Sequence, residues 1–162
     1  MRITTLAEYG VICALHLARR TDEGPITGRE LAELERLPSD YVEQILLRLR
    51  RAGIVRSTRG ARGGYALARE AEQISIRDVM EASETTTFDL HCVSHPVGEE
   101  RCSSSQTCSI RPVWLLLQRK IDDVLESVRL SDLLAEEGEV RSRVGLVTTA
   151  ERDADRRALP VL

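Results

Sequence analysis

The sequence predicts a mainly α-helical fold with one small β-hairpin: a winged helix-turn-helix domain followed by a long dimerisation helix. Three observations lead to this prediction: a helix-turn-helix pattern over about 28–52, a basic hairpin over about 54–68, and a long apolar-rich helical segment within 112–134. With 162 residues and 42% hydrophobic content, the chain can fill one core of ordinary size.

Charge is distributed unevenly along the chain. The formal net charge is −3, yet residues 44–69 hold seven arginines and no acidic residue. Such a stretch favours contact with phosphates, to which arginine adds forked, planar hydrogen bonding. No apolar run approaches the ~18 residues of a membrane span, and the first residues lack a basic-then-apolar secretory pattern. We therefore expect a cytoplasmic, globular protein.

The first predicted helix covers about 3–20 and ends at a turn over 22–25. Its apolar residues recur at helical spacing and form one wide face: Leu6, Tyr9, Val11, Ile12, Leu15 and Leu17. Cys13 and His16 lie on the same helix, and we interpret both as packing residues.

A capping-box pattern marks the start of the helix-turn-helix. Thr27 and Glu30 have the spacing at which both side chains satisfy backbone N–H groups at a helix start. The helix that they open, about 28–36, is expected to bury Leu31 and Leu34.

The second helix of the motif follows a short break at 37–38. Ser39 and Asp40 are predicted to cap it, with Glu43 three residues after Asp40. Its expected buried face is Val42, Ile45, Leu46 and Leu49. Gly53 fits the left-handed residue past its end. Helix, short turn and helix form the unit that places its second helix in a DNA major groove.

A basic hairpin comes directly after this motif. Residues 54–58 alternate as a strand does, 59–64 form a basic, glycine-rich turn, and 65–67 read as the returning strand. This is the pattern of a wing. Arg59 and Arg62 in its turn are candidates for entry into a minor groove.

Groove entry requires a helix whose first turn presents hydrogen-bonding side chains outwards. The candidates are Ser39, Asp40, Tyr41, Glu43 and Gln44. Gln44 can pair with adenine and Glu43 with the cytosine amino group. Four arginines can position the domain on phosphates: Arg48, Arg50, Arg51 and Arg56. The alternative is a solvated basic helix in a winged-helix domain that binds protein.

The C-terminal half divides into three predicted regions. Ser75 and Asp78 form another capping box, which opens a short helix that completes a first domain over 1–83. A cysteine-containing loop follows at 84–111. A long helix and a short capped turn at 112–134 then precede a tail, 135–162, expected to be disordered. The apolar residues of the long helix cover more than one face, so a partner subunit is the natural partner for them.

Three of the four cysteines cluster in the predicted loop, as Cys92-x9-Cys102-x5-Cys108. In a reducing compartment a stable disulfide framework is disfavoured, so metal or redox chemistry is the better interpretation. Thiolates suit iron–sulphur clusters, zinc or copper(I), and the lack of a Cys-x2-Cys pair makes a zinc site less favoured. Unligated thiols in a loop remain the alternative.

Several motifs resemble, in order, the IscR/NsrR-type family of winged-helix transcription regulators. They are MRITTLAEYGVICALHLA, PSDYVEQILLRLRRAGIVRSTRGARGGYALA, SIRDVMEA and the loop cysteines, within about 1–134. The resemblance implies a homodimer paired through the long helix, which binds palindromic double-stranded DNA. It also implies an iron–sulphur cluster, either 2Fe-2S or 4Fe-4S, whose state governs promoter binding.

By position, Cys92, Cys102 and Cys108 match the cluster ligands of that family, residues 39–44 its recognition-helix contacts, and Arg59 its wing contact. Two features depart from the family pattern. The first cysteine gap is longer, and Arg111 stands where IscR-type members place a histidine ligand.

The fourth ligand therefore has several candidates. Glu8 matches the position where NsrR-like members supply a carboxylate from the partner subunit. His91, His95, water or a small thiol are the alternatives. Cys13 is not among the ligands that the resemblance implies.

Two other functions compete with a cluster-dependent regulator. One is a cluster-free winged-helix regulator that senses by thiol oxidation, and the other is an electron-transfer iron–sulphur protein. We find no cofactor fingerprint and no nucleophile–base pair, so the sequence predicts that the protein is not an enzyme.

Overall fold

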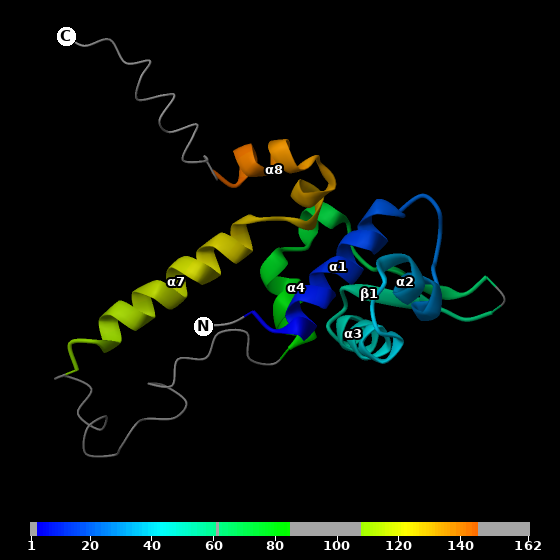
Figure 1. Ribbon diagram of the computed structural model, residues 1–162, viewed down its shortest axis with the longest axis horizontal. Helices are drawn as coiled ribbons and strands as arrows, with labels where there is room; N and C mark the ends of the chain where they lie inside the picture. Colours follow the sequence, from blue (N-terminus) through cyan, green and yellow to red (C-terminus); the bar gives the residue numbers. More distant parts are fainter. Residues whose placement is uncertain (1–2, 61, 85–107, 146–162) are drawn as a thin grey trace, which may run out of the picture.

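The computed structural model describes residues 3–60, 62–84 and 108–145 (Figure 1). The predicted fold class is confirmed: the described chain is mainly helical, with one two-stranded antiparallel hairpin. The elements are α1 (Thr5–Arg19), α2 (Gly28–Glu35), α3 (Ser39–Arg51), β1 (Val55–Thr58), β2 (Gly64–Leu67), the 3-10 turn η1 (Ala71–Gln73), α4 (Ile76–Ser83), α7 (Arg111–Ser127), the 3-10 turn η2 (Leu130–Leu134) and α8 (Glu137–Arg143). Within these ranges, no helix is long and apolar enough to cross a membrane.

Helix α1 runs through the centre of the body, and α3 and α4 both pack against it (Figure 1). Its buried residues are mostly small: Ala7, Gly10, Cys13, Ala14, Leu17 and Ala18. The large residues of the predicted apolar face, apart from Leu17, are half-buried. The centre of the core takes the small residues instead, because small side chains let neighbouring helices approach α1 more closely than large ones do.

Helix α2 is capped by Thr27, which is one half of the predicted capping box. The Thr27 hydroxyl accepts a hydrogen bond from the Glu30 backbone N–H at 3.1 Å. Leu31 is fully buried, as expected, but Leu34 is 55% exposed. The prediction for Leu34 was wrong, since a helix of eight residues buries only one narrow face here.

Helix α3 buries the four residues predicted for its inner face: Val42, Ile45, Leu46 and Leu49. The predicted cap is wrong. Pro38 is the N-cap residue, and no side chain caps the helix. Ser39 is already helical, because the Pro38 carbonyl accepts the first helical bonds from Tyr41 and Val42, both at 3.1 Å. Gly53 has φ +71°, which confirms its predicted left-handed conformation.

The hairpin is joined to the rest of the body by a bridge. In its register Val55 lies opposite Leu67 and Thr58 opposite Gly64. Ile26, just before α2, pairs with Tyr65 through two backbone hydrogen bonds of 3.0 and 2.7 Å. The base of the wing is therefore fixed to the helix-turn-helix.

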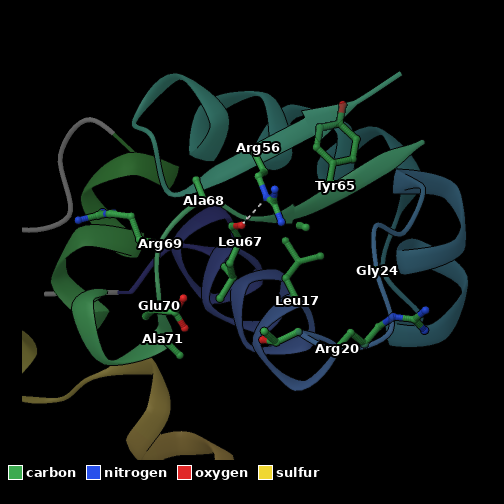
Figure 2. A pocket seen from close by; sticks show the side chains of 12 residues that line it. Leu17, Arg20, Gly24, Arg56, Tyr65, Leu67, Ala68, Arg69, Glu70 and Ala71 are labelled. Carbon is green, nitrogen blue, oxygen red and sulfur yellow. Dashed lines mark hydrogen bonds between the residues drawn. The ribbon is translucent and has the colours of Figure 1, made fainter. Parts of the chain in front are cut away.

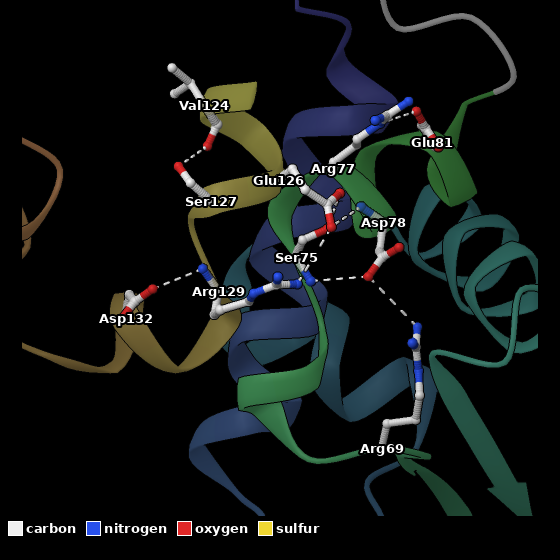
Figure 3. Close-up of polar contacts among 10 residues, drawn as sticks. All are labelled: Arg69, Ser75, Arg77, Asp78, Glu81, Val124, Glu126, Ser127, Arg129 and Asp132. Carbon is white, nitrogen blue, oxygen red and sulfur yellow. Dashed lines mark hydrogen bonds and ion pairs between the residues drawn. The ribbon is translucent and has the colours of Figure 1, made fainter. Parts of the chain in front are cut away.

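The chain on the C-terminal side of α7 returns to the start of α4 (Figure 3). Ser75 and Asp78 form the predicted capping box, with both hydrogen bonds at 3.0 Å. Beside it, the Ile76 N–H donates to the Val128 carbonyl and the Leu130 N–H to the Ile74 carbonyl. These contacts attach the base of α7 to the body.

Two elements of the C-terminal half extend beyond the core. Helix α7 begins at Arg111 with Pro112 in its first turn, as predicted, and none of its residues is fully buried. Helix α8 lies in the region predicted to be a disordered tail. Two i,i+4 ion pairs, Glu137–Arg141 at 2.7 Å and Glu139–Arg143 at 2.6 Å, favour this helix without any apolar periodicity.

Replacing Gly64 by alanine should destabilise the protein. Gly64 has φ +156°, and a Cβ there would overlap the Ile26 backbone, which cannot rotate away as a side chain could. We expect a loss of roughly 2 kcal/mol or more in the free energy of unfolding, measured by chemical denaturation. Gly138→Ala is the control, since no atom lies within 4 Å of its Cβ position. Equal stability of the two variants would show that the bridge is not needed.

Candidate nucleic-acid interface and cysteine site

The outer face of α3 presents the polar residues that the sequence singled out. Ser39, Asp40, Tyr41, Glu43 and Gln44 are all exposed, while the opposite face of the helix is buried in the core. The core thereby fixes the orientation of a solvated polar surface on a rigid helix. This is the arrangement that groove reading requires.

Tyr41 is held in place by an aromatic neighbour. Its ring meets that of Tyr9 on α1 edge-on, with the centroids 6.0 Å apart and the planes at 77°. Edge-to-face contacts of this kind are favourable for aromatic rings. Tyr41 remains 43% exposed, so it can still contact a ligand while α1 supports it.

The Glu43 carboxylate lies against Gly28, the first residue of α2, where a Cβ would overlap it. A helix N-terminus carries partial positive charge, which stabilises a nearby carboxylate. The sequence proposed Glu43 as a base contact. In the structure its carboxylate is placed at the start of α2, so it would have to leave that position to reach a base.

The wing carries exposed cations at its tip. Arg59 and Arg62 flank the turn between β1 and β2, and both are exposed. The hairpin is also tied to α3, because Arg50 Nη1 donates to Ser57 Oγ at 3.2 Å. The hairpin and α3 therefore form one connected surface.

Arg48 occupies a different position from that expected of a phosphate contact. It is half-buried, and its Nη1 donates to the Ser83 carbonyl at the end of α4, at 2.5 Å. The guanidinium thus links α3 to α4.

A hollow of about 300 Å³ lies between the C-terminal end of α1 and the base of the hairpin (Figure 2). Arg56 lies at its centre and donates from Nε to the Leu67 carbonyl at 3.0 Å. Successive strand residues alternate between the two hairpin faces, and Ser57 contacts Arg50 of α3. Arg56 therefore lies on the hairpin face turned away from α3, which makes it a poor candidate for contact with the same DNA groove.

Of the three loop cysteines, only Cys108 lies among the described residues. It is half-buried and stands three residues before α7. Cys92, Cys102, His91 and His95 lie outside the described residues. Within 3–60, 62–84 and 108–145, no group of three or more His, Cys, Asp or Glu side chains is arranged to hold a metal ion.

Glu8 is exposed on the first turn of α1. Its backbone N–H donates to the Thr4 carbonyl at 3.0 Å, so the two residues share one side of the helix. The Thr4 hydroxyl contacts the Glu84 carboxylate, and Glu84 is the last described residue before the segment with Cys92 and Cys102. Glu8 therefore lies at the end of α1 that is next to Glu84.

Cys13 and His16 lie farther along α1 and act as packing residues. Cys13 is fully buried, and burial raises the pKa of its thiol to about 12, with a further contribution from the Glu35 carboxylate. His16 Nδ1 lies 2.5 Å from Glu35 Oε1. A thiol with such a pKa stays protonated at neutral pH, which disfavours metal binding and oxidation.

Sequence reasoning missed the contacts around the end of α4. Ser83 is fully buried against Gly10, where a Cβ would overlap the Ser83 side chain. The available signal was Gly10 itself, since an isolated glycine within an apolar helical pattern indicates a close approach. The partner element could not be identified from that signal.

Comparisons with known proteins agree with this geometry. Residues 3–136 match the Rrf2 family, described as an iron-dependent transcriptional regulator. The chain is 31% identical over 160 residues to the HTH-type transcriptional regulator IscR of Xenorhabdus nematophila, covering 99% of this chain and 92% of that protein.

Two solved structures are similar over most of their length. The first is T. potens IscR, with a TM-score of 0.65 and 29% identity, covering 100% of this chain and 94% of that one. The second is CymR, the global cysteine regulator of B. subtilis, with a TM-score of 0.66 and 30% identity, covering 82% of this chain and 95% of that one. These similarities confirm the winged-helix fold class and the predicted resemblance.

The buried thiol predicts a specific pH dependence. An exposed cysteine ionises near pH 9.0 and the folded Cys13 near 12, so ionisation favours the unfolded chain between these values. The free energy of unfolding should fall with rising pH in this window more steeply in the wild type than in Cys13→Ala, by up to ~1.4 kcal/mol per pH unit. Denaturation of the reduced proteins measures both slopes. Below pH 9 the slopes should agree, and agreement above it would contradict the burial argument.

Proposed function

Because this chain belongs to the Rrf2 family of transcriptional regulators, we propose that it binds promoter DNA as a homodimer under the control of an iron–sulphur cluster. The chain is a DNA-binding regulator and not an enzyme. The observation that carries the proposal is the exposed polar face of α3 beside the basic tip of the wing.

In this proposal the DNA contacts come from two elements. The first two turns of α3 read base edges in the major groove through Ser39, Asp40, Tyr41 and Gln44. Arg59 and Arg62 extend the contact into the neighbouring minor groove or onto phosphates. Arg48 acts from behind this surface, because its guanidinium is bound to α4.

The donor set fits an iron–sulphur cluster. Cys92, Cys102 and Cys108 offer three thiolates, the ligands typical of such clusters. Glu8 of the partner subunit is proposed as the fourth ligand, and its place at the N-terminal end of α1, near Glu84, is compatible with this role. When bound, a 2Fe-2S or a 4Fe-4S cluster would be the sensing group, because its integrity responds to redox state, oxygen, nitric oxide or iron supply.

The homodimer is supported by the exposed apolar surface of α7. None of its residues is fully buried, and six large apolar side chains are exposed: Val113, Trp114, Leu115, Leu116, Leu117 and Val124. Leaving such a surface in water forfeits about 25 cal/mol per Å². A second copy of α7 would cover it, and a two-fold dimer would match a palindromic operator.

The likeness to the cysteine regulator of B. subtilis favours a second candidate. In that case the chain regulates transcription without a cluster and senses oxidation of its loop thiols. Anaerobic purification separates the two, since a cluster gives visible absorption and thiols do not.

Each loop cysteine should be necessary for the cluster. Replacing Cys92, Cys102 or Cys108 by serine removes one thiolate ligand and should abolish visible absorption after anaerobic reconstitution. Cys13→Ala is the control and should keep the spectrum, because that thiol is buried in the core, away from the N-terminal end of α1. Full iron and sulphide content in all three loop variants would contradict the assignment of these cysteines as cluster ligands.

Glu8→Ala tests the fourth ligand. We expect a changed spectrum or faster decay in air, with the DNA affinity of the cluster-free protein unaltered. Identical spectra and decay would leave His91, His95 or an external ligand as candidates.

The two DNA-contacting elements should respond differently to substitution. Arg62→Ala removes a proposed phosphate or minor-groove contact, so affinity should fall for all sequences and the salt slope should decrease by about one. Gln44→Ala should change the preference among operator variants by about 1–3 kcal/mol at one position. Arg77→Ala, on α4 beside Glu81, is the charge-matched control (Figure 3). If Arg77→Ala bound DNA as weakly as Arg62→Ala, the wing contact would be refuted.

Helix α7 should mediate the dimer. The wild type should scatter light as twice the 18.1 kDa chain at micromolar concentration. Leu116→Glu places a charge in the proposed apolar interface and should yield monomers. Leu34→Glu, which changes an equally exposed leucine on α2, should leave the dimer intact. A monomeric wild type would contradict the proposal.

A further inference from the structure

The C-terminal end of α4 is packed into the core. Ser83, its last residue, is fully buried, and its hydroxyl donates to the Val79 carbonyl at 2.7 Å. Gly10 of α1 lies directly against the Ser83 side chain, with no room for a Cβ. A displacement of the end of α4 is therefore passed on to α1.

Arg48 provides the second attachment. The last carbonyls of a helix have no partner within the helix, and they carry partial negative charge. Arg48 Nη1 donates to one of them, the Ser83 carbonyl, at 2.5 Å. A hydrogen bond from a guanidinium is among the strong ones, so this contact ties the last turn of α3 to the end of α4.

The chain continues from this junction into the cysteine segment. Glu84 follows Ser83, and its carboxylate accepts a hydrogen bond from the Thr4 hydroxyl at the start of α1. Thr4 is one turn from Glu8. Three elements thus meet just before the segment with Cys92 and Cys102: the start of α1, the end of α4 and the last turn of α3.

We propose that Arg48 is a positioning residue that transmits the state of the cysteine segment to the recognition helix. A shift of Ser83 moves the carbonyl that Arg48 holds and so changes the placement of α3. This role rests on the proposed function, because it requires a cysteine segment that changes state. Arg48 acts through Ser83 rather than by direct contact with DNA.

The test compares DNA affinity in two states of the full-length dimer, cluster-free and anaerobically reconstituted, on DNA from the promoter upstream of its own gene. The measured quantity is the ratio of the two dissociation constants. In Arg48→Gln this ratio should move at least about fivefold closer to one, the lower range of typical couplings, while the visible spectrum stays as in the wild type. Arg48→Lys keeps a cationic donor and should restore most of the ratio.

Arg50→Gln is the matched control. Arg50 lies two residues further along α3, and its hydrogen bond goes to Ser57 in the wing. This variant should weaken binding in both states by the same factor and leave the ratio unchanged. A general loss of helix stability or of positive charge would affect both variants alike, so it could not produce the expected difference.

The outcomes separate the coupling from the proposed function. A normal spectrum with an unchanged ratio in Arg48→Gln overturns the coupling and leaves the cluster standing. If the wild type forms no cluster, the cluster function fails, and the same ratio is measured between reduced and diamide-oxidised protein. A wild-type affinity that responds to neither treatment also overturns the coupling.

Discussion

Gly10 leaves no room for a side chain on the face of α1 that meets α4, and the rest of the molecule depends on this close approach. Because Ser83 reaches the core there, its carbonyl lies within range of Arg48 on α3. The same approach places Glu84 beside the start of α1. One pair of small residues therefore determines how α3 is joined to the end of α4, from which the chain continues to the cysteines.

The order and type of the main elements could be predicted from local signals. Capping patterns at Thr27 and Ser75, the left-handed Gly53 and the inner face of α3 depend on neighbours a few residues away. The buried face of α1 could not be predicted in the same way. Hydrophobicity favours its large residues, whereas the packing of α3 and α4 selects the small ones, and that selection depends on non-local contacts.

The candidate site was predictable only in part. Exposure of Gln44 and Arg62 follows from polar residues on a helix face and in a turn, so the sequence sufficed. The positions of Arg48 and Glu43 depend on α4 and α2, which meet α3 only in the folded chain. Charge alone could not distinguish a solvent-exposed arginine from one that binds a helix end, because both kinds lie in the same acid-free stretch.

Leu130 has a consequence for the order in which the chain folds. It is fully buried in the same core as α1 and α4, although it follows α7 in sequence. Helices α1 to α4 are synthesised first and can pack against one another, yet this core stays incomplete until the segment that pairs with Ser75 supplies Leu130. Helices α1 to α4 and the segment after α7 thus share one core, and a chain that ends before Leu130 would leave an apolar gap in it.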